Sequence, residues 1–399
     1  MITFKEAYGH VLDQSKDFGV ATVPLNTAMG RVLAESVYAD RDFPPFDRAT
    51  KDGIVISYAA IEKGITQFGV EGVIPAGTAQ TNLEEIHSCM EIMTGAVVPE
   101  GADTVIMYED ISIANGKAQL KIKPIKGQNI HRKGTDERKG AMVLEANTKL
   151  SAAEIGVLAS VGKAEVRVRK LPRITVLSTG NELVEVTEIP LAHQIRKSNL
   201  HVLFAALSKE QIIPGQLHML DNKRVIEEQL SHALRANDVL LLSGGVSKGK
   251  YDFIPEVLDI LGVKKIFHRV LQRPGKPFWF GIHEALGTLI FSFPGNPVST
   301  FANYHVYFKD WFNKSLGLPI PKIEVILKED MAIGGKLTRF VRAKLHLEQG
   351  ALTASLVRGN GSGDLTSLAK SDGFVRLDPE KNTYKKGMKV PFIPTRNIL

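Results

Sequence analysis

The chain has 399 residues, which is too many for one hydrophobic core, so its length predicts two to four domains. Hydrophobic residues make up 44% and charged residues 23%, a composition typical of globular proteins that argues against extensive disorder. The formal charge of +7 comes from 50 basic and 43 acidic residues. Because the basic residues are dispersed and do not alternate with aromatic ones, this charge favours small anionic ligands over nucleic acid.

Several protein classes are not expected. No apolar run reaches the roughly 18 residues that a membrane-spanning helix needs. The first residues, MITFKE, do not form a basic segment followed by an apolar one, so they do not predict a secretion signal, and we expect a cytoplasmic protein. Cys89 is the single cysteine, which excludes an internal disulfide and a cysteine-rich zinc site. Its surroundings, SCMEIM, predict a buried strand residue without a catalytic role.

The first 171 residues predict a small β domain inserted into a linking segment. Apolar spacing predicts a helix over residues 3–16, followed by short extended pieces. Short β-type runs separated by Gly and Pro then predict a small, mostly β domain over residues 46–136. Residues 1–45 and 137–171 make up the linking segment, in which Ser151 and Glu154 form the capping box of a second helix.

From residue 172 onward the pattern changes twice. Residues 172–318 alternate strands and helices with short connections, which predicts a doubly wound α/β domain. The sequence LPIP at 318–321 reads as a linker, and the strands after it predict a small β-barrel or sandwich over residues 319–399. The expected fold class is therefore multidomain, α/β plus β.

Four segments of the second half have the composition of anion-binding loops. They are residues 177–183 (LSTGNEL), 243–247 (SGGVS), 273–277 (RPGKP) and 294–297 (PGNP). Three of them directly follow an apolar β-type run, so they should gather at the sheet edge where ligands bind in open α/β sheets. Backbone N–H groups, hydroxyls and a lysine at that edge indicate an anionic, phosphate-bearing ligand.

Each segment also has a simpler interpretation. The SGGVS segment is the strongest signal, because a plain strand-to-helix turn would need only one glycine. Glu182 has two interpretations. In one it orients a nucleophile or holds a metal, and in the other its carboxylate only interacts with the positive end of the next helix. Residues 273–277 by themselves fit a solvated hairpin tip, and residues 294–297 fit a structural turn. By spacing alone, residues 47–53 and 93–96 are turns, and Asp136 is one residue of a basic loop.

Taken together and in order, these segments resemble the MoeA family, the molybdopterin molybdenumtransferases that include the gephyrin E domain. The matching pieces cover nearly the whole chain. They are PPFD at 44–47 with Asp52 and Gly53, IMTGA at 92–96, RKG at 132–134 with Asp136, residues 178–183, residues 243–247, PGKPF at 274–278, residues 294–298, and GSG at 361–363 with SLA at 367–369.

The resemblance implies a fold, an assembly and a reaction. The fold has a doubly wound domain similar to MogA and MoaB, a small β domain, a linking α/β segment and a C-terminal β-barrel. The assembly is a homodimer in which the α/β domain of one subunit faces the small β domain of the other. The reaction converts adenylylated molybdopterin and molybdate into molybdenum cofactor and AMP with the help of Mg²⁺. The adenylyltransferase of the preceding step is a candidate partner.

The resemblance also implies roles for particular residues. Asp52, Thr94, Asp136 and Glu182 match catalytic acidic and hydroxyl positions. The substrate-binding positions are Ser178, Thr179, Gly180, Ser243, Gly244, Gly245, Ser247, Pro294, Gly295, Asn296 and Pro297. The molybdate-binding positions are Arg273, Lys276, Pro277, Arg342 and Ser362.

Lys197 and Lys250 depart from the family, which usually has acidic residues at these positions. Smaller departures are Lys51, Asn181 and Arg273. Lysine cannot ligate Mg²⁺, which requires oxygen donors. Either the ammonium groups replace the metal in neutralising phosphate, or Asp252 takes over as its ligand, or the chain binds nucleotide without inserting metal.

Three functions are therefore weighed. The favoured one is metal insertion with an altered cation requirement. A non-catalytic member that binds pterin or a protein partner is the alternative, and an adenylyltransferase on the same α/β domain is a third. The sequence does not distinguish molybdate from tungstate.

Overall fold

The computed structural model describes residues 1–246 and 252–397. The chain divides into two compact units, which are described separately. Unit 1 contains Met1–Thr22, Gly30–Ala34 and Arg167–Leu399, and unit 2 contains Val23–Met29 and Glu35–Val166. This division is coarser than the four predicted parts, whose boundaries stay predictions. In the described residues, no helix has the length and apolar character needed to cross a membrane.

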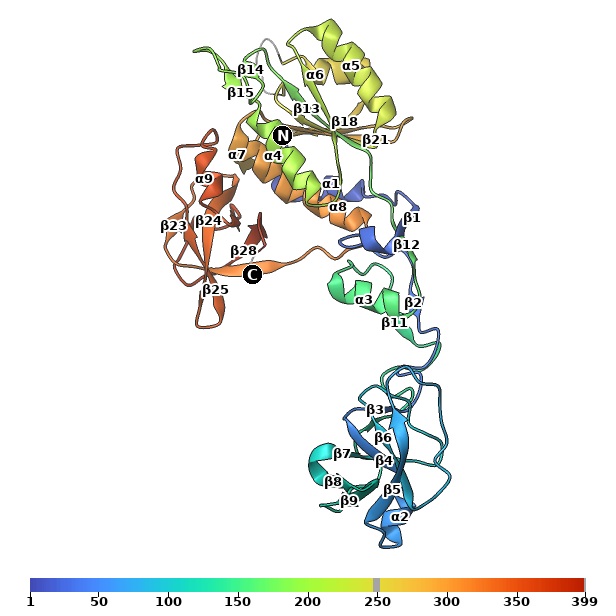
Figure 1. Ribbon diagram of the computed structural model, residues 1–399. Coiled ribbons are helices and arrows are strands. Elements are labelled where there is room, and N and C mark those ends of the chain that lie inside the picture. Colours follow the sequence, from blue (N-terminus) through green and yellow to red (C-terminus); the bar gives the residue numbers. More distant parts are fainter. Residues whose placement is uncertain (247–251, 398–399) are drawn as a thin grey trace. The chain divides into compact units, whose positions relative to one another are not determined.

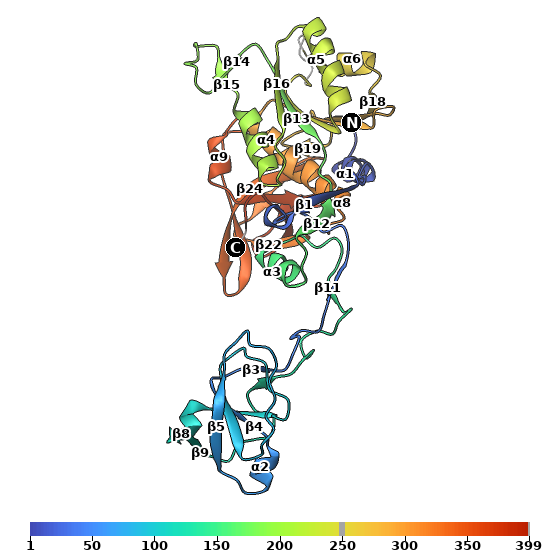
Figure 2. The same ribbon diagram turned by 45° about the vertical axis from the view of Figure 1, so that its right-hand side comes forward.

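Unit 2 is built on a six-stranded sheet with the order β7-β4-β6-β5-β9-β8. Its strands are β4 (Gly53–Ile56), β5 (Gln67–Ile74), β6 (Ser88–Ile92), β7 (Thr104–Met107), β8 (Ile111–Ala114) and β9 (Lys117–Leu120). Helix α2 (Ala59–Glu62) lies at one end of this sheet (Figure 2). Cys89 is fully buried on β6, as predicted, and burial raises the pKa of its thiol to about 12.

Smaller elements complete unit 2. They are η1 (Leu25–Thr27), β2 (Val37–Tyr38), β3 (Arg48–Ala49), η2 (Tyr108–Asp110), β10 (Ile130–His131), β11 (Met142–Leu144) and α3 (Ala152–Ser160). The predicted capping box of α3 is present, because Ser151 accepts a hydrogen bond at the helix start and its own N–H donates to Glu154 at 2.7 Å. Strands β1 (Val20–Pro24) and β12 (Glu165–Arg169) each extend across a boundary of the two units.

The doubly wound domain of unit 1 has a six-stranded sheet with the order β16-β13-β17-β21-β20-β18. Its strands are β13 (Ile174–Thr179), β16 (Gly215–Met219), β17 (Val239–Ser243), β18 (Lys264–His268), β20 (Trp279–His283) and β21 (Thr288–Phe293). The first four in spatial order are parallel, which confirms the predicted fold class. Strand β20 was not predicted; it pairs antiparallel with both β18 and β21.

Helices cover both faces of this sheet (Figure 1). Helices α5 (Lys223–Ala236) and α6 (Ile254–Ile260) lie on one face. The other face carries α1 (Phe4–Asp13), α4 (Ser198–Ser208), α7 (Pro297–Asn303) and α8 (Lys309–Ser315). The helical segment after residue 296 is not one continuous α-helix, because η3 (Tyr304–Phe308), a π-helical turn, lies between α7 and α8.

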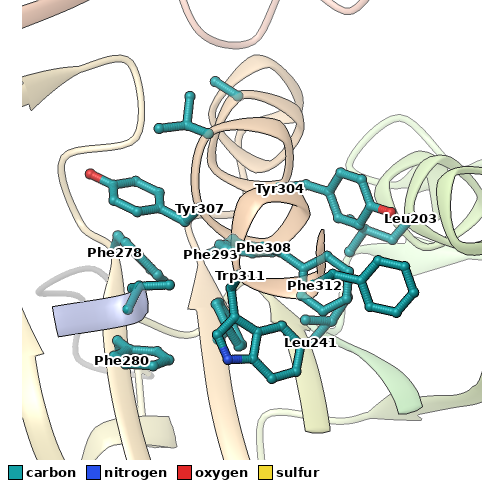
Figure 3. Close-up of a cluster of buried hydrophobic side chains, with 14 of the residues drawn as sticks. Leu203, Leu241, Phe278, Phe280, Phe293, Tyr304, Tyr307, Phe308, Trp311 and Phe312 are labelled. Carbon is teal, nitrogen blue, oxygen red and sulfur yellow. The ribbon is translucent and has the colours of Figure 1, made fainter. Parts of the chain in front are cut away.

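Aromatic side chains fill much of the core between the sheet and α7, η3 and α8 (Figure 3). Phe278 packs on Tyr307 with ring centroids 4.8 Å apart, and Phe308 lies 5.4 Å from Trp311. Rings of this size remove a large apolar area from water and account for much of the stability of such a core. The turn η3 is therefore held by packing on several sides.

The C-terminal domain is a closed five-stranded barrel, which confirms the predicted barrel. Its strands are β22 (Ile323–Leu327), β24 (Thr338–Glu348), β25 (Ala351–Leu356), β26 (Gly373–Leu377) and β28 (Lys389–Pro394), and the pairing of β24 with β26 closes the ring. Short elements around it are β23 (Met331–Ala332), α9 (Thr366–Ala369) and β27 (Thr383–Tyr384). Strand β19 (Gln272–Arg273), from the doubly wound domain, adds to β24 in parallel. Closure leaves few free strand edges.

Candidate functional site

A cavity of about 1250 Å³ lies at the carboxyl ends of the parallel strands, within unit 1. All four predicted anion-loop segments contribute to its wall. The predicted site residues that line it are Ser178, Thr179, Gly180, Glu182, Ser243, Gly244, Gly245, Asp252, Arg273, Lys276, Pro277, Pro294, Gly295, Asn296, Pro297, Arg342 and Ser362. Ser247 and Lys250 lie outside the described residues.

The strand order places this cavity at a topological switch point. From β13 the chain passes through α4 to β16 on one side, and then through α5 to β17 on the other side. The crevice at such a reversal is where open α/β sheets bind ligands. The short strands β14 (Leu183–Val184) and β15 (Ile195–Arg196) form a parallel pair beside it.

Gly244 allows two loops to approach each other closely. Its φ of +103° lies in a range that L side chains rarely adopt. A Cβ atom at this position would be 2.9 Å from Thr179 Oγ1 and 3.1 Å from the Thr179 carbonyl oxygen. The Gly244 backbone is therefore packed directly against Thr179, which keeps bare main chain at the cavity wall.

The hydroxyl groups of the loops are engaged within the protein. The Ser178 hydroxyl lies 3.0 Å from His218 Nδ1. Asn199 donates from Nδ2 to Ser243 Oγ at 2.8 Å and to the Gly295 carbonyl oxygen at 2.6 Å, which ties the ends of β17 and β21 together. These bonds orient the loops, and direct contact of the hydroxyls with a ligand stays a prediction.

Cationic side chains outnumber carboxylates among the described residues that line the cavity. The cations are Arg196, Lys197, Arg273, Lys276, Arg339, Arg342 and Arg358, and the carboxylates are Glu182, Asp221, Asp252 and Glu329. Burial lowers the pKa of the Arg342 guanidinium, which donates to the Ser367 hydroxyl and the Gly361 carbonyl. The surplus of positive charge favours anionic ligands.

Lys197 is a nearly buried cation in this wall. Its side chain is 8% exposed, and its ammonium lies 2.5 Å from a carboxylate oxygen of Glu185, which is 56% exposed. Lys197 is also the N-cap residue of α4, where the helix dipole favours negative charge. A buried ammonium at this helix end adds positive charge to the cavity wall, which favours binding of an anion.

The described residues do not fit a Mg²⁺ site made by the protein alone. In the part of the chain that the structure covers, no three His, Cys, Asp or Glu side chains are placed to hold one ion. The cavity carboxylate of Asp221 accepts the Asn181 N–H at 3.2 Å, and that of Glu329 accepts the Leu356 N–H at 3.0 Å. We therefore assign no chemical step to a metal.

The other three predicted catalytic residues lie in unit 2. Asp52 accepts hydrogen bonds from the Thr94 N–H at 2.6 Å and from the Thr94 hydroxyl at 2.7 Å, and these bonds hold the pKa of Asp52 below its usual range. Asp136 lies 2.8 Å from His131 Nε2, while Arg48 donates to His131 Nδ1 at 3.2 Å. Thr94 therefore stabilises the ionised form of Asp52, and Asp136 is paired with His131.

Some residues of the cavity wall had no signal in the sequence. Arg339 and Arg358 belong to the barrel region, where a strand pattern does not tell which polar residues face a neighbouring domain. His218 is not among the described residues that line the cavity; it contacts the Ser178 hydroxyl from the edge strand β16, and its pKa is lowered by burial and by the charge of Lys197. These residues are distant from the loops in the sequence and lie near them only in the folded protein.

The fold and the cavity define a class, namely multidomain proteins built around a doubly wound ligand-binding domain. Family models match in three consecutive parts: the MoeA N-terminal region (domain I and II) over residues 2–162, a probable molybdopterin binding domain over residues 175–314, and the MoeA C-terminal region (domain IV) over residues 324–395. The chain belongs to the MoeA family, the molybdopterin molybdenumtransferases.

Relatives are similar over nearly their whole length. A molybdopterin molybdenumtransferase from a Synechocystis species is 39% identical over 94% of this chain and 95% of its own. A protein of the same name from Staphylococcus aureus is 30% identical over 99% of this chain and 96% of its own. A crystal structure of a molybdopterin biosynthesis MoeA protein from Pyrococcus horikoshii has a TM-score of 0.83 at 27% identity and covers 100% of both chains.

Proposed function

We propose that the protein inserts molybdate into adenylylated molybdopterin and releases AMP and molybdenum cofactor. The observation that carries the proposal is that four anion-loop segments and a surplus of cations meet in one cavity of the described residues. A ligand with a phosphoanhydride and a second, tetrahedral anion needs several separate anion-binding positions. The names of the full-length relatives support the same activity.

The chemistry follows from the charges. Release of AMP requires an oxygen nucleophile, either water or a molybdate oxygen, which forms a new bond to phosphorus as the phosphoanhydride bond between the pterin phosphate and the nucleotide breaks. Negative charge then develops on the departing phosphate. The fixed cations of the cavity wall stabilise that charge, because their positions are set before the ligand arrives, and among them Arg273 and Lys276 are the ones that the resemblance assigns to molybdate. Holding molybdate beside the pterin in the same cavity removes much of the entropic barrier of a reaction between separate molecules.

The test is a turnover assay with adenylylated molybdopterin and molybdate, in which AMP release and cofactor formation are both measured. We expect AMP to appear only when molybdate is present. Repeating the assay with and without Mg²⁺ tests the cation requirement. Absence of AMP under both conditions refutes the proposal. Conversion of free molybdopterin and ATP into the adenylylated form would instead identify an adenylyltransferase.

Two lysine variants distinguish the loss of a cavity cation from a general effect of lost positive charge. Lys276→Met removes a cavity cation and should lower kcat/KM about 100-fold, as loss of one group that stabilises transition-state charge typically does. Lys370→Met removes an exposed lysine that does not line the cavity and should leave kcat/KM unchanged. Equal effects of both substitutions would contradict the assignment of the cavity as the reaction site.

A homodimer is part of the proposal. The sequence resemblance implies that Asp52, Thr94 and Asp136 serve the cavity of a second copy. Two inactive variants, Asp52→Asn and Lys276→Met, should then restore activity when mixed, up to about a quarter of the wild-type value, because half of the randomly formed dimers contain one intact site. Separately inactive variants that stay inactive on mixing would show that the residues do not act across subunits.

Two further expectations stay open to measurement. The relatives' names do not favour the alternative of a non-catalytic member, and binding of adenylylated molybdopterin without turnover would revive it. The choice between molybdate and tungstate depends on size and charge that the two oxyanions nearly share. Parallel assays with both oxyanions decide it.

A further inference from the structure

A buried hydrogen-bond network supports the Arg273–Lys276 side of the cavity from behind. Gln272, Asn303 and Tyr307 form it, and all three side chains are fully buried. Gln272 donates from Nε2 to Asn303 Oδ1 at 2.8 Å and to the Pro274 carbonyl oxygen at 3.0 Å. Its Oε1 accepts a hydrogen bond from the Tyr307 hydroxyl. Buried polar groups of this kind are costly unless paired, so a fully paired network fixes one geometry.

The network turns the carbonyl groups of the loop away from the cavity. The Gly275 carbonyl accepts from Asn303 Nδ2 at 3.3 Å, and the Lys276 carbonyl accepts from the Val270 N–H at 2.9 Å. With the Pro274 carbonyl, three successive oxygen atoms are bound by the protein interior. An anion site requires this arrangement, since carbonyl oxygens facing the anion would repel it. Arg273 and Lys276 remain exposed at the cavity wall.

The π-helical turn η3 brings the two supporting residues to this place. Asn303 ends α7 and Tyr307 lies within η3, four residues further on. Figure 3 shows the Tyr307 ring above Phe278 with its hydroxyl pointing away from Phe308 and Trp311. Widened turns of this type often occur at functional sites in helices. Gly275 completes the fit, because a Cβ atom there would lie 2.3 Å from Asn303 Oδ1.

We propose that Asn303 and Tyr307 are positioning residues, which act through Gln272 and Gly275 to hold Arg273 and Lys276 for binding of the tetrahedral oxyanion. This inference rests on the proposed function, because it assigns the loop to molybdate. The residues do not touch the substrate themselves. Small displacements of groups that hold a reactant can change rates by one to two orders of magnitude.

The closing experiment compares two tyrosines of the same turn. Tyr307→Phe removes the hydroxyl that binds Gln272. Tyr304→Phe is the matched control, because the buried Tyr304 hydroxyl has no hydrogen-bond partner among residues 1–246 and 252–397. We expect Tyr307→Phe to raise the apparent KM for molybdate about 10-fold while the KM for adenylylated molybdopterin changes less than about twofold. Tyr304→Phe should change neither value.

Amide hydrogen exchange gives a readout that does not depend on turnover. The backbone amide of Val270, which donates to the Lys276 carbonyl, and those of Arg273, Gly275 and Lys276 should exchange faster in Tyr307→Phe than in the wild type or in Tyr304→Phe. Unchanged exchange overturns the inference, and so does faster exchange without a change in the molybdate KM. If the wild-type protein consumes no molybdate, the proposed function is contradicted. The exchange comparison then tests only whether Tyr307 holds the loop in place.

Gln272→Leu provides a second variant in the same network. It removes the donor to Asn303 and the acceptor for Tyr307, so loop exchange and the molybdate KM should change more than in Tyr307→Phe. A purely structural role would lower the melting temperature of both variants while leaving the two KM values in their wild-type ratio. That outcome also overturns the inference.

Discussion

Replacing Gly244 by alanine should destabilise the doubly wound domain by about 2 to 5 kcal/mol. An L residue in the left-handed range costs about 1 to 2 kcal/mol, and φ here is +103°. The added Cβ lies 2.9 Å from Thr179 Oγ1 and 3.1 Å from a backbone oxygen, which cannot move without shifting β13. Overpacking of this kind typically costs about 1 to 3 kcal/mol.

Tryptophan fluorescence during urea unfolding measures this change in the right domain. Trp279 on β20 and Trp311 on α8 are the only tryptophans, and both are buried in the doubly wound domain. Signals from the small β domain and the barrel therefore do not contribute directly, which matters because a multidomain chain need not unfold in two states.

The matched control is Gly295→Ala. Its added Cβ would lie 3.6 Å from Gly244 Cα, an ordinary contact, and its φ is outside the left-handed range. We expect a change within about 0.5 kcal/mol. Equal stability of the wild type and Gly244→Ala, or equal loss in both variants, would refute the packing argument.

Three other predictions use single residues. Cys89 should stay unreactive toward a disulfide reagent until the protein is unfolded, because burial raises the pKa of its thiol to about 12; rapid reaction of the native protein would contradict this. Thr94→Val removes one of two hydrogen bonds to Asp52, so the Asp52 pKa, measured by NMR titration, should rise toward its usual value. Ionised Asp52 stabilises the fold above its unfolded-state pKa, and this stabilisation is lost as pH falls from the unfolded-state pKa through the lower folded-state pKa. In the variant the stabilisation should therefore be smaller, and its loss should be complete at a higher pH. Glu185→Gln leaves the buried Lys197 ammonium without its carboxylate and should destabilise the domain by about 1 to 3 kcal/mol. Lys197→Met leaves only an exposed carboxylate and should destabilise it by less than about 1 kcal/mol. A larger loss of stability in Lys197→Met than in Glu185→Gln, measured by urea unfolding, would show that Lys197 is not held by this pair.

The gathering of the anion loops was predictable because its signals are local. An apolar run followed by Gly and Ser marks a buried strand and the turn after it, and parallel strands bring such turns to one edge. Strand β20 was missed although the four-residue loop 284–287 joins it directly to β21, because a loop of this length with one glycine is a weaker hairpin signal than a two-residue Asn-Gly or Asp-Gly turn. Local patterns therefore predicted the ligand edge better than the complete sheet.

The support of the site was not predictable for a different reason. The sequence FANYHVYF fits a buried helix, and it contains no sign that η3 widens the turn. Asn303 and Tyr307 acquire their role only from Gln272, about thirty residues away in the sequence. A polar residue on an apolar helix face can be paired in many ways, and only the fold selects one.

The charges of the cavity connect the departures of this chain with its proposed activity. Lys197 places a buried ammonium at the start of α4, and Glu185 compensates it from the solvent side. A phosphate-bearing ligand would therefore meet a fixed cation at a position where the resemblance leads us to expect a carboxylate. An ammonium can neutralise phosphate without the geometry that Mg²⁺ demands. If the Lys197 ammonium takes over part of the role of the metal, omission of Mg²⁺ should weaken AMP binding less in the wild type than in Lys197→Met. Titration calorimetry with AMP, with and without Mg²⁺, measures the difference. Equal Mg²⁺ dependence of the two proteins would show that Lys197 does not substitute for the ion.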